Sequence, residues 1–193
     1  MSDRRRAEVV AAAMAILEES GLEAVTMRAI ADRLGIRAPS LYRQFPDKRA
    51  IEIALIAAGF EEQASAFEEA SATDEPAARA IAGVYRAWAL AHPHLYRLMT
   101  ERPLPREELP AGLEARAAAP VLRAFGGEVD RARAGWAFAH GMTSLELAGR
   151  FPPGADLDAA WAVGIDAIAA VAGSDPGTNA TTDDRSSSGR RPA

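Results

Sequence analysis

Residues 21–48 read GLEAVTMRAIADRLGIRAPSLYRQFPDK, and their pattern indicates two short helices in close succession. Thr26 is a good N-cap for the first, whose apolar residues recur at spacings of three and four until Gly35 ends it. The second is expected over about residues 37–44, because the residue before Pro46 is pushed out of helical dihedrals. Two short helices joined by a turn, with a helix on either side, are typical of a helix-turn-helix.

The second short helix has a face suited to DNA. At 100° per residue, an inward-facing Leu41 places Phe45 beside it. Pro39, Ser40 and Arg43 then lie on the opposite face, with Tyr42 and Gln44 flanking them. Small, hydrogen-bonding and cationic side chains are what a major groove accepts, because they can reach base edges or phosphates.

Lys48 is a further candidate for a phosphate contact. It is the only lysine in a chain with 21 arginines, and it lies in the first turn of a long helix that Asp47 is expected to cap. Its ammonium and the free backbone amides of that helix start can meet one phosphate together. Thr26 and Arg28, at the start of the first short helix, can contact the opposite phosphate strand. The alternative is that Lys48 is an ordinary solvated surface lysine.

Charge and composition limit the classes of protein to consider. The chain has 193 residues, of which 49% are hydrophobic, and a formal net charge of −5. Residues 1–50 carry nine Arg or Lys and seven Asp or Glu, whereas the remainder carries 13 and 20, so only the amino-terminal quarter is basic. The absence of cysteine excludes disulfides and thiolate metal sites and suits the cytoplasm. No apolar stretch approaches the ~20 residues that cross a bilayer, so we expect no membrane partner.

The periodicity predicts an all-α fold of about nine helices, because apolar residues recur at spacings of three and four and strict alternation is absent. We expect a three-helix DNA-binding domain over residues 1–50, with its helix-turn-helix at about 26–45. A helical bundle should follow over residues 51–172, where Ile53, Ile56, Phe60, Ala64 and Phe67 of the long helix point at a separate core. Residues 173–193 contain only Ala, Gly, Pro and polar or charged residues, which predicts a disordered tail.

The amino-terminal pattern resembles the DNA-binding domain of the tetracycline-repressor (TetR) family over about residues 7–55. The resemblance is carried by Gly21 to Arg28, Ile30-Ala31, Leu34-Gly35-Ile36, Pro39-Ser40-Leu41-Tyr42 and Phe45-Pro46-Asp47-Lys48. It implies a dimer whose two recognition helices enter successive major grooves of a palindromic operator. The contact positions it implies are Thr26, Arg28, Arg37, Ala38, Pro39, Ser40, Tyr42, Gln44 and Lys48, to which the face described above adds Arg43. The alternative is a core-packing helical hairpin without DNA affinity.

The carboxy-terminal part carries a shorter resemblance. Trp136, His140-Gly141 and Leu145-Glu146-Leu147 are similar to one TetR subfamily named for its Trp-His-Gly signature. A mainly apolar cavity with a few polar groups is the expected effector site. Its candidate lining residues are Tyr85, Trp88, Tyr96, Met99, Trp136, His140 and Met142. The competing interpretation is that these aromatic and methionine residues, which recur at helical spacing, form an ordinary core.

The last helix keeps one apolar face, which predicts a dimer contact. The residues we expect at this contact are Leu145, Trp161, Ile165, Ile168 and Ala172. The family resemblance implies that the final two helices pair with their symmetry mates in a four-helix bundle. Two recognition helices must then lie about one duplex turn apart, roughly 34 Å, to bind both half-sites.

A rival function is a helical metal-dependent enzyme that uses His92, His94, His140 and Glu146. Little supports it, because His92 and His94 bracket Pro93 and are not the i, i+4 pair of a helical zinc site. A third possibility is a DNA-binding protein controlled by a partner protein or by nothing. We expect a non-enzymatic transcriptional repressor without metal or cofactor, whose partners are operator DNA, a second copy of itself and a small effector. The effector, the operator and the regulated genes do not follow from the sequence.

Overall fold

The computed structural model describes residues 2–171, and these form nine α-helices and no strand. The helices are α1 (Ser2–Ser20), α2 (Met27–Leu34), α3 (Pro39–Tyr42), α4 (Lys48–Ser71), α5 (Ala77–Ala91), α6 (Pro93–Thr100), α7 (Leu113–Ala124), α8 (Val129–Leu147) and α9 (Leu157–Ala170), with short 3₁₀ turns η1 (Leu22–Ala24) and η2 (Arg106–Glu108). The predicted all-α fold is confirmed. The tail predicted at 173–193 lies outside the described residues.

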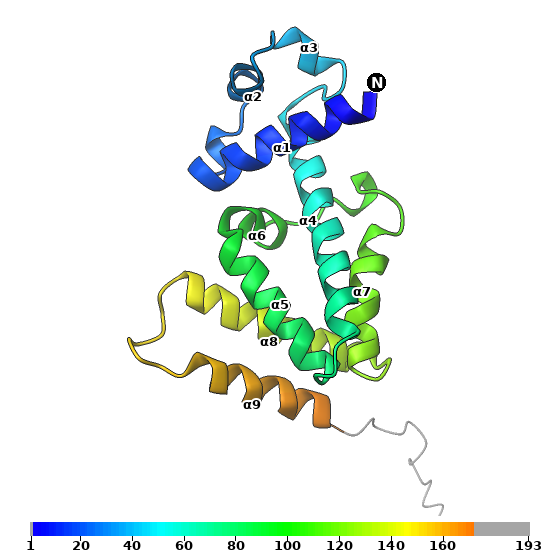
Figure 1. The fold of residues 1–193 in the computed structure, drawn as a ribbon, viewed down its shortest axis with the longest axis vertical. Coiled ribbons are helices and arrows are strands. Elements are labelled where there is room, and N and C mark those ends of the chain that lie inside the picture. Colours follow the sequence, from blue (N-terminus) through cyan, green and yellow to red (C-terminus); the bar gives the residue numbers. More distant parts are fainter. Residues whose placement is uncertain (1, 172–193) are drawn as a thin grey trace, which may run out of the picture.

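Helices α1, α2 and α3 gather at one end of the molecule, and the long α4 runs from them toward the other end (Figure 1). A first hydrophobic core joins these four helices, and Leu17, Ile30, Leu41, Phe45 and Ile51 are among its fully buried side chains. Burying such side chains stabilises each by about 1.5–3 kcal/mol relative to exposure, which fixes the short α2 and α3 against the longer helices.

The first core continues beyond residue 50. Leu95, Leu98 and Met99 of α6 belong to it, together with Ile56 of α4. Ile53 and Phe60, which we expected to point at a separate core, also pack against it. The boundary predicted at residue 50 therefore does not separate two cores, because α4 and α6 serve both parts of the molecule.

A second core joins α4, α5, α7, α8 and α9. Ion pairs between Arg116 and Glu61 and between Arg123 and Glu68 hold α7 parallel to α4, as Figure 1 shows. Helices α8 and α9 cross closely, because the ring of Phe138 occupies the space beside Gly164, where any larger side chain would collide. Within residues 2–171, no helix combines the length and the hydropathy needed to cross a membrane.

Candidate functional sites

Local signals build the helix-turn-helix as expected. The Thr26 hydroxyl accepts a hydrogen bond from the backbone N–H of Ala29 at 3.1 Å and so caps α2. Gly35 ends α2 with φ 63°, a left-handed conformation that glycine adopts without steric cost. The Ile36 N–H donates to the Ala31 carbonyl across this turn, and the chain is thereby directed into α3.

Helix α3 is shorter than the predicted span of residues 37–44. Only Pro39–Tyr42 is α-helical, but hydrogen-bonded turns flank it, from Ser40 N–H to the Arg37 carbonyl and from Gln44 N–H to the Leu41 carbonyl. The backbone therefore keeps a helical course from residue 37 to 45, with tighter turns on either side of the α-helical part. A segment held between Gly35 and Pro46 has no room for a longer regular helix.

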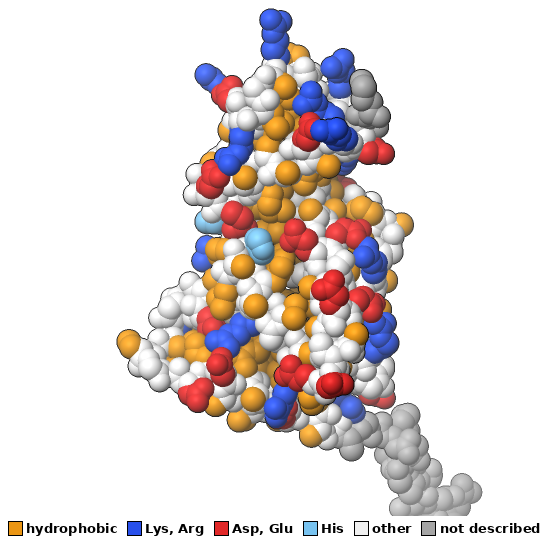
Figure 2. Space-filling model, in the orientation of Figure 1, with side chains coloured by type: hydrophobic (Ala, Val, Ile, Leu, Met, Phe, Trp, Pro, Cys, Tyr) orange, Lys and Arg blue, Asp and Glu red, His pale blue; other side chains and the backbone are white. Residues whose placement is uncertain are grey.

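The predicted DNA-binding side chains lie on the outside of this motif. Leu41 is buried, whereas Tyr42 is 51% exposed. The exposed members of the predicted set are Thr26, Arg28, Arg37, Pro39, Tyr42 and Arg43, and the half-buried ones are Ala38, Ser40, Gln44 and Lys48. Figure 2 shows several Lys and Arg side chains projecting from the end of the molecule that α1–α3 form.

Arginines at this end differ in how far their charges are already paired. Arg33 donates two hydrogen bonds to Glu19, at 2.6 and 2.7 Å, and this contact lowers the pKa of the Glu19 carboxyl. Arg6 donates to the Gln44 carbonyl and stacks over the ring of Phe45 at 4.3 Å, which ties α1 to the end of α3. Arg37 and Arg43, by contrast, have no carboxylate partner in the part of the chain that the structure describes. They are therefore cations available to an external anion.

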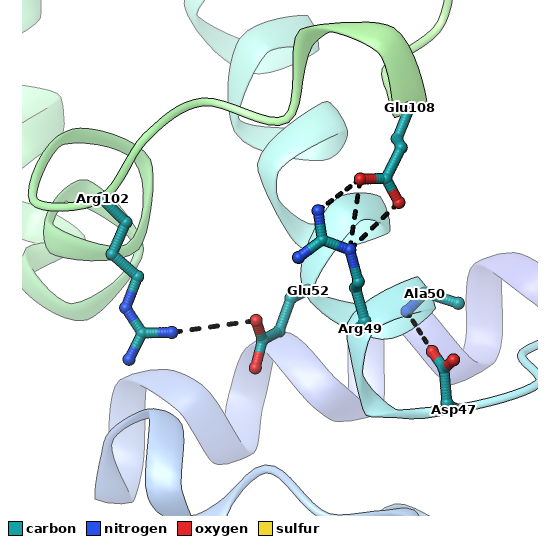
Figure 3. Close-up of polar contacts among 6 residues, drawn as sticks. All are labelled: Asp47, Arg49, Ala50, Glu52, Arg102 and Glu108. Carbon is teal, nitrogen blue, oxygen red and sulfur yellow. Dashed lines mark hydrogen bonds and ion pairs between the residues drawn. The ribbon is translucent and has the colours of Figure 1, made fainter.

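Lys48 has a partner that its sequence position did not predict. Its ammonium donates to the Leu22 carbonyl at 2.9 Å and so ties η1 to the first turn of α4. Asp47 caps that helix as expected, by accepting from the Ala50 N–H at 2.8 Å (Figure 3). An ammonium has three donors, so the bond to Leu22 still leaves two for a phosphate.

The second candidate site is a partly open cavity of about 620 Å³ lined by α4 to α9, a size typical of small-molecule sites. Five of the seven predicted effector residues line it, namely Tyr85, Trp88, Tyr96, Met99 and Trp136. His140 and Met142 do not. Lining residues that the sequence analysis missed include Phe60, Gln63, Phe67, Leu104, Val121 and Phe125, most of them on α4 and α7. The signal for α4 was present, because its apolar stripe contains Phe60 and Phe67, but we assigned that stripe to a core.

His140 lies behind the cavity wall and supports it. The Tyr96 hydroxyl lies 2.6 Å from His140 Nδ1, 3.2 Å from the His140 carbonyl and 3.3 Å from Ser144 Oγ. Trp136 stacks on the His140 ring at a centroid distance of 5.7 Å and is 53% exposed. The Trp-His pair that suggested a subfamily signature thus orients a tyrosine of α6, and Met142 packs against the second core.

Helix α6 connects the cavity with the DNA-binding end. The Glu18 carboxylate of α1 accepts from the backbone N–H groups of His94 and Leu95, at 3.3 and 2.8 Å, and so caps α6 at its first turn. Farther along α6, Tyr96 and Met99 line the cavity. Figure 1 places α6 beside α1, so this one helix contacts both the DNA-binding end and the cavity.

A second connection joins the start of α4 to the segment before α7. Figure 3 shows the Arg49 guanidinium against both oxygens of Glu108, and this contact lowers the pKa of the Glu108 carboxyl. In the same view Arg102, which lines the cavity, lies 3.9 Å from Glu52. Both pairs bridge the long loop after α6 and the helix that leaves the DNA-binding end.

Glu146 is engaged in a partly buried ion pair. Its carboxylate accepts from the Arg86 guanidinium at 2.9 Å and from the Trp161 indole N–H at 2.6 Å, which joins α5, α8 and α9. Residues 2–171 contain no group of three or more His, Cys, Asp or Glu side chains placed to hold a metal ion. The arrangement gives no support to the rival metal-dependent enzyme.

The prediction for the dimer contact needs correction. Trp161 and Ile165 are buried in the second core of a single chain, so they have no surface to offer a second copy. The apolar face of α9 that the periodicity indicated is turned inward, because α9 covers α5 and α8. Leu145 is 43% exposed and Ile168 half-buried, while Ala172 lies outside the described residues.

Comparisons with known proteins agree with this arrangement. Residues 9–55 match the family described as "Bacterial regulatory proteins, tetR family", and residues 78–168 match "Tetracyclin repressor-like, C-terminal domain". The latter match does not confirm the Trp-His-Gly subfamily. The chain is 29% identical to the uncharacterized HTH-type transcriptional regulator Rv0681 of Mycobacterium tuberculosis, over 75% of this chain and 71% of that protein. It is 40% identical to the class C tetracycline repressor of Escherichia coli, over 28% of this chain and 25% of that protein.

Solved structures are similar along most of the chain. The crystal structure of regulatory protein SCO4313 has a TM-score of 0.70 at 27% identity, with 86% of this chain and 95% of that chain covered. A TetR variant from Acinetobacter baumannii in complex with minocycline has a TM-score of 0.59 at 27% identity, with 84% and 92% covered. The two family matches lie in order along the chain, the first on the helix-turn-helix and the second on the helical bundle. This protein therefore belongs to the TetR family of transcriptional regulators.

Proposed function

We propose that this protein is a homodimeric repressor that binds a palindromic operator and leaves it when a small, largely apolar effector occupies the cavity. The observation that carries the proposal is the exposed surface around α3, where Arg37 and Arg43 have no carboxylate partner among residues 2–171 and Tyr42 is exposed. Unpaired cations beside an exposed hydroxyl are suited to phosphates and base edges in a major groove.

In this proposal the helix-turn-helix contacts DNA with the residues predicted from the sequence. Thr26 and Arg28 at the start of α2 contact one phosphate strand, and Lys48 at the start of α4 contacts the other. Ser40, Arg43 and Gln44 contact base edges, so they determine which sequence is preferred. Arg37, Ala38, Pro39 and Tyr42 complete the contact surface. The buried Leu41 supports the proposal, because it anchors α3 while leaving these groups outward.

The dimer contact is proposed for the outer faces of α8 and α9. Val163 of α9 is 71% exposed, and Leu145 of α8 is exposed as well. Exposed apolar side chains on two neighbouring helices are suited to a two-fold contact, in which each copy presents the same surface.

The effector is proposed to act through α6. A molecule in the cavity touches Tyr96 and Met99, and the other end of the same helix is held by Glu18 of α1. If the cavity fills better when α6 is displaced, the effector favours a geometry in which the two recognition helices no longer match two half-sites. The size of that effect is limited by the difference in effector affinity between the two states.

Selection from a random pool of duplexes tests the proposal. The full chain should enrich an inverted repeat whose half-sites lie about one helical turn apart. A Ser40→Ala variant should enrich a different half-site, because Ser40 contacts a base edge. Failure to enrich any sequence, or enrichment of a single site without a repeat, would contradict a two-fold DNA-binding dimer.

A further inference from the structure

The cavity wall holds two buried, uncharged polar side chains among mainly apolar ones. Gln63 of α4 is 8% exposed and Tyr85 of α5 is 6% exposed, and both line the cavity. The two come from neighbouring helices, because Phe67, one turn after Gln63, packs against Tyr85 with ring centroids 6.5 Å apart. The wall around them is formed by side chains such as Phe60 and Ile81.

The Tyr85 hydroxyl is a buried polar atom without a geometrically acceptable hydrogen-bond partner among the described residues, and Gln63 lies beside it on the same wall. The Tyr85 hydroxyl is fully buried, and its ring meets Tyr96 edge to face, but the Tyr96 hydroxyl is taken by His140 and Ser144. Burial, with a smaller effect from Tyr96, raises the pKa of the Tyr85 phenol far above its usual range, so it is a hydrogen-bond donor at neutral pH. The Gln63 amide offers both a donor and an acceptor.

A buried hydroxyl like that of Tyr85 destabilises a protein as long as it stays unpartnered. A buried polar group without a partner loses its hydration and gains nothing in return, and proteins retain few of them. Leu or Phe at these positions would give a better-packed and more stable wall. An unpartnered Tyr85 hydroxyl beside the Gln63 amide on one cavity wall therefore indicates a place for a polar atom of a bound molecule.

The arginines on the cavity wall lie near the solvent, and each is paired with a carboxylate. The arginines are Arg102, Arg106 and Arg133, and their carboxylate partners are Glu52, Glu114 and Asp130 respectively. All three guanidinium side chains are more than half exposed. An anion held deep in the cavity would lack a cation beside it, which is costly in a region of low dielectric.

We propose that the effector is an uncharged, mainly apolar molecule whose hydroxyl or carbonyl oxygen accepts hydrogen bonds from Tyr85 and Gln63. The inference rests on the proposed function, because it takes the cavity as the effector site. A hydroxyl can in addition donate to the Gln63 carbonyl oxygen, so an alcohol satisfies both side chains. Glu114 Oε1, a buried acceptor without a partner on the same wall, can take a second hydroxyl.

The test uses the full chain and the fluorescent apolar probe N-phenyl-1-naphthylamine, which is displaced by 1-decanol, 2-decanone, decanoate or decylammonium. We compare the wild type with the double variant Gln63→Leu and Tyr85→Phe. The free energy of transferring a given competitor out of water is the same for both proteins. The ratio of its affinities for the wild type and the double variant therefore reports the polar contact. The alcohol and the ketone should bind the variant about tenfold more weakly, while the probe should bind within about twofold.

A matched control is Thr143→Val. Thr143 is fully buried with an unpartnered hydroxyl, but it is not part of the cavity wall. The Thr143→Val substitution should raise the melting temperature and leave the affinity of every competitor unchanged. The double variant should also raise the melting temperature, so a loss of alcohol binding in a more stable protein excludes unfolding as the cause.

Unchanged alcohol and ketone affinities in the double variant would overturn the inference, as would tighter binding of decanoate than of 1-decanol to the wild type. In those cases the probe would still bind, and the cavity would remain the proposed effector site, but for a molecule of another chemical class. If neither the probe nor any competitor binds the wild type, the effector part of the proposed function fails together with the inference.

Discussion

Gly59 of α4 and Met99 of α6 are in direct contact, and the contact depends on the absence of a side chain at residue 59. A Cβ atom at Gly59 would lie 2.5 Å from Met99 Sδ and 3.2 Å from Leu95 Cδ2. Met99 also lines the cavity, and both Met99 and Leu95 belong to the first core. The glycine therefore brings the helix that leaves the DNA-binding end against the helix that borders the effector cavity.

Gly59→Ala is expected to displace the Met99 side chain into the cavity, because methionine is flexible and the helix backbones are not. Overpacking of this kind destabilises a protein by about 1–3 kcal/mol. We expect a lower melting temperature and weaker binding of N-phenyl-1-naphthylamine in a fluorescence titration.

Gly83→Ala is the matched control for that experiment. Gly83 lies within α5 and a Cβ there would meet no atom within 4 Å. Removing a helical glycine should stabilise the protein by about 0.5–1 kcal/mol and leave probe binding unchanged. If Gly59→Ala, like Gly83→Ala, raised the melting temperature and left probe binding unchanged, the close contact between α4 and α6 would not depend on a glycine at residue 59.

Glu18→Ala removes the carboxylate that caps α6 and should lower the free energy of unfolding in urea by about 1 kcal/mol. Its neighbour provides the comparison, because Glu19 pairs with the exposed Arg33. Glu19→Ala should cost well under 1 kcal/mol, as exposed ion pairs do. Equal losses of unfolding free energy for the two variants would show that the Glu18 cap on α6 stabilises the protein no more than an exposed ion pair does.

Lys48→Ala should change both folding and DNA binding. The Leu22 carbonyl loses its donor, which should lower the free energy of unfolding by about 1 kcal/mol. Removal of one phosphate contact should also lower the slope of log affinity against log salt by about one. A loss of stability with an unchanged salt slope would mean that Lys48 acts only within the fold.

The sequence predicted the local features of this protein better than its long-range contacts. Thr26, Asp47 and Gly35 act within a few residues of their own positions, and the structure confirms their roles as caps and helix end. Periodicity showed that Trp161 has an apolar environment, but it cannot tell whether a second chain or the same chain supplies it. Gln63 was missed because an isolated polar residue on a long helix acquires meaning only when α5 places Tyr85 nearby.

Val163→Asp should disrupt the dimer without unfolding the chain. Val163 is exposed in a single chain, so a charge there costs little until a second copy covers it. Sedimentation velocity should show a shift from dimer to monomer. Leu90→Asp on α5, which is also exposed, should leave the dimer intact. A Val163→Asp protein that sediments like the wild type would place the contact elsewhere.

The most direct test of the account measures the affinity for the enriched duplex by fluorescence anisotropy, with Arg43→Ala compared to Arg33→Ala. Both variants lose one exposed arginine of the helix-turn-helix, but Arg33 is paired with Glu19 and Arg43 has no carboxylate partner among residues 2–171. The account predicts that Arg43→Ala weakens binding about tenfold or more and that Arg33→Ala changes it by less than about threefold. Equal affinities for the two variants, or no affinity of the wild type for any duplex, would contradict it.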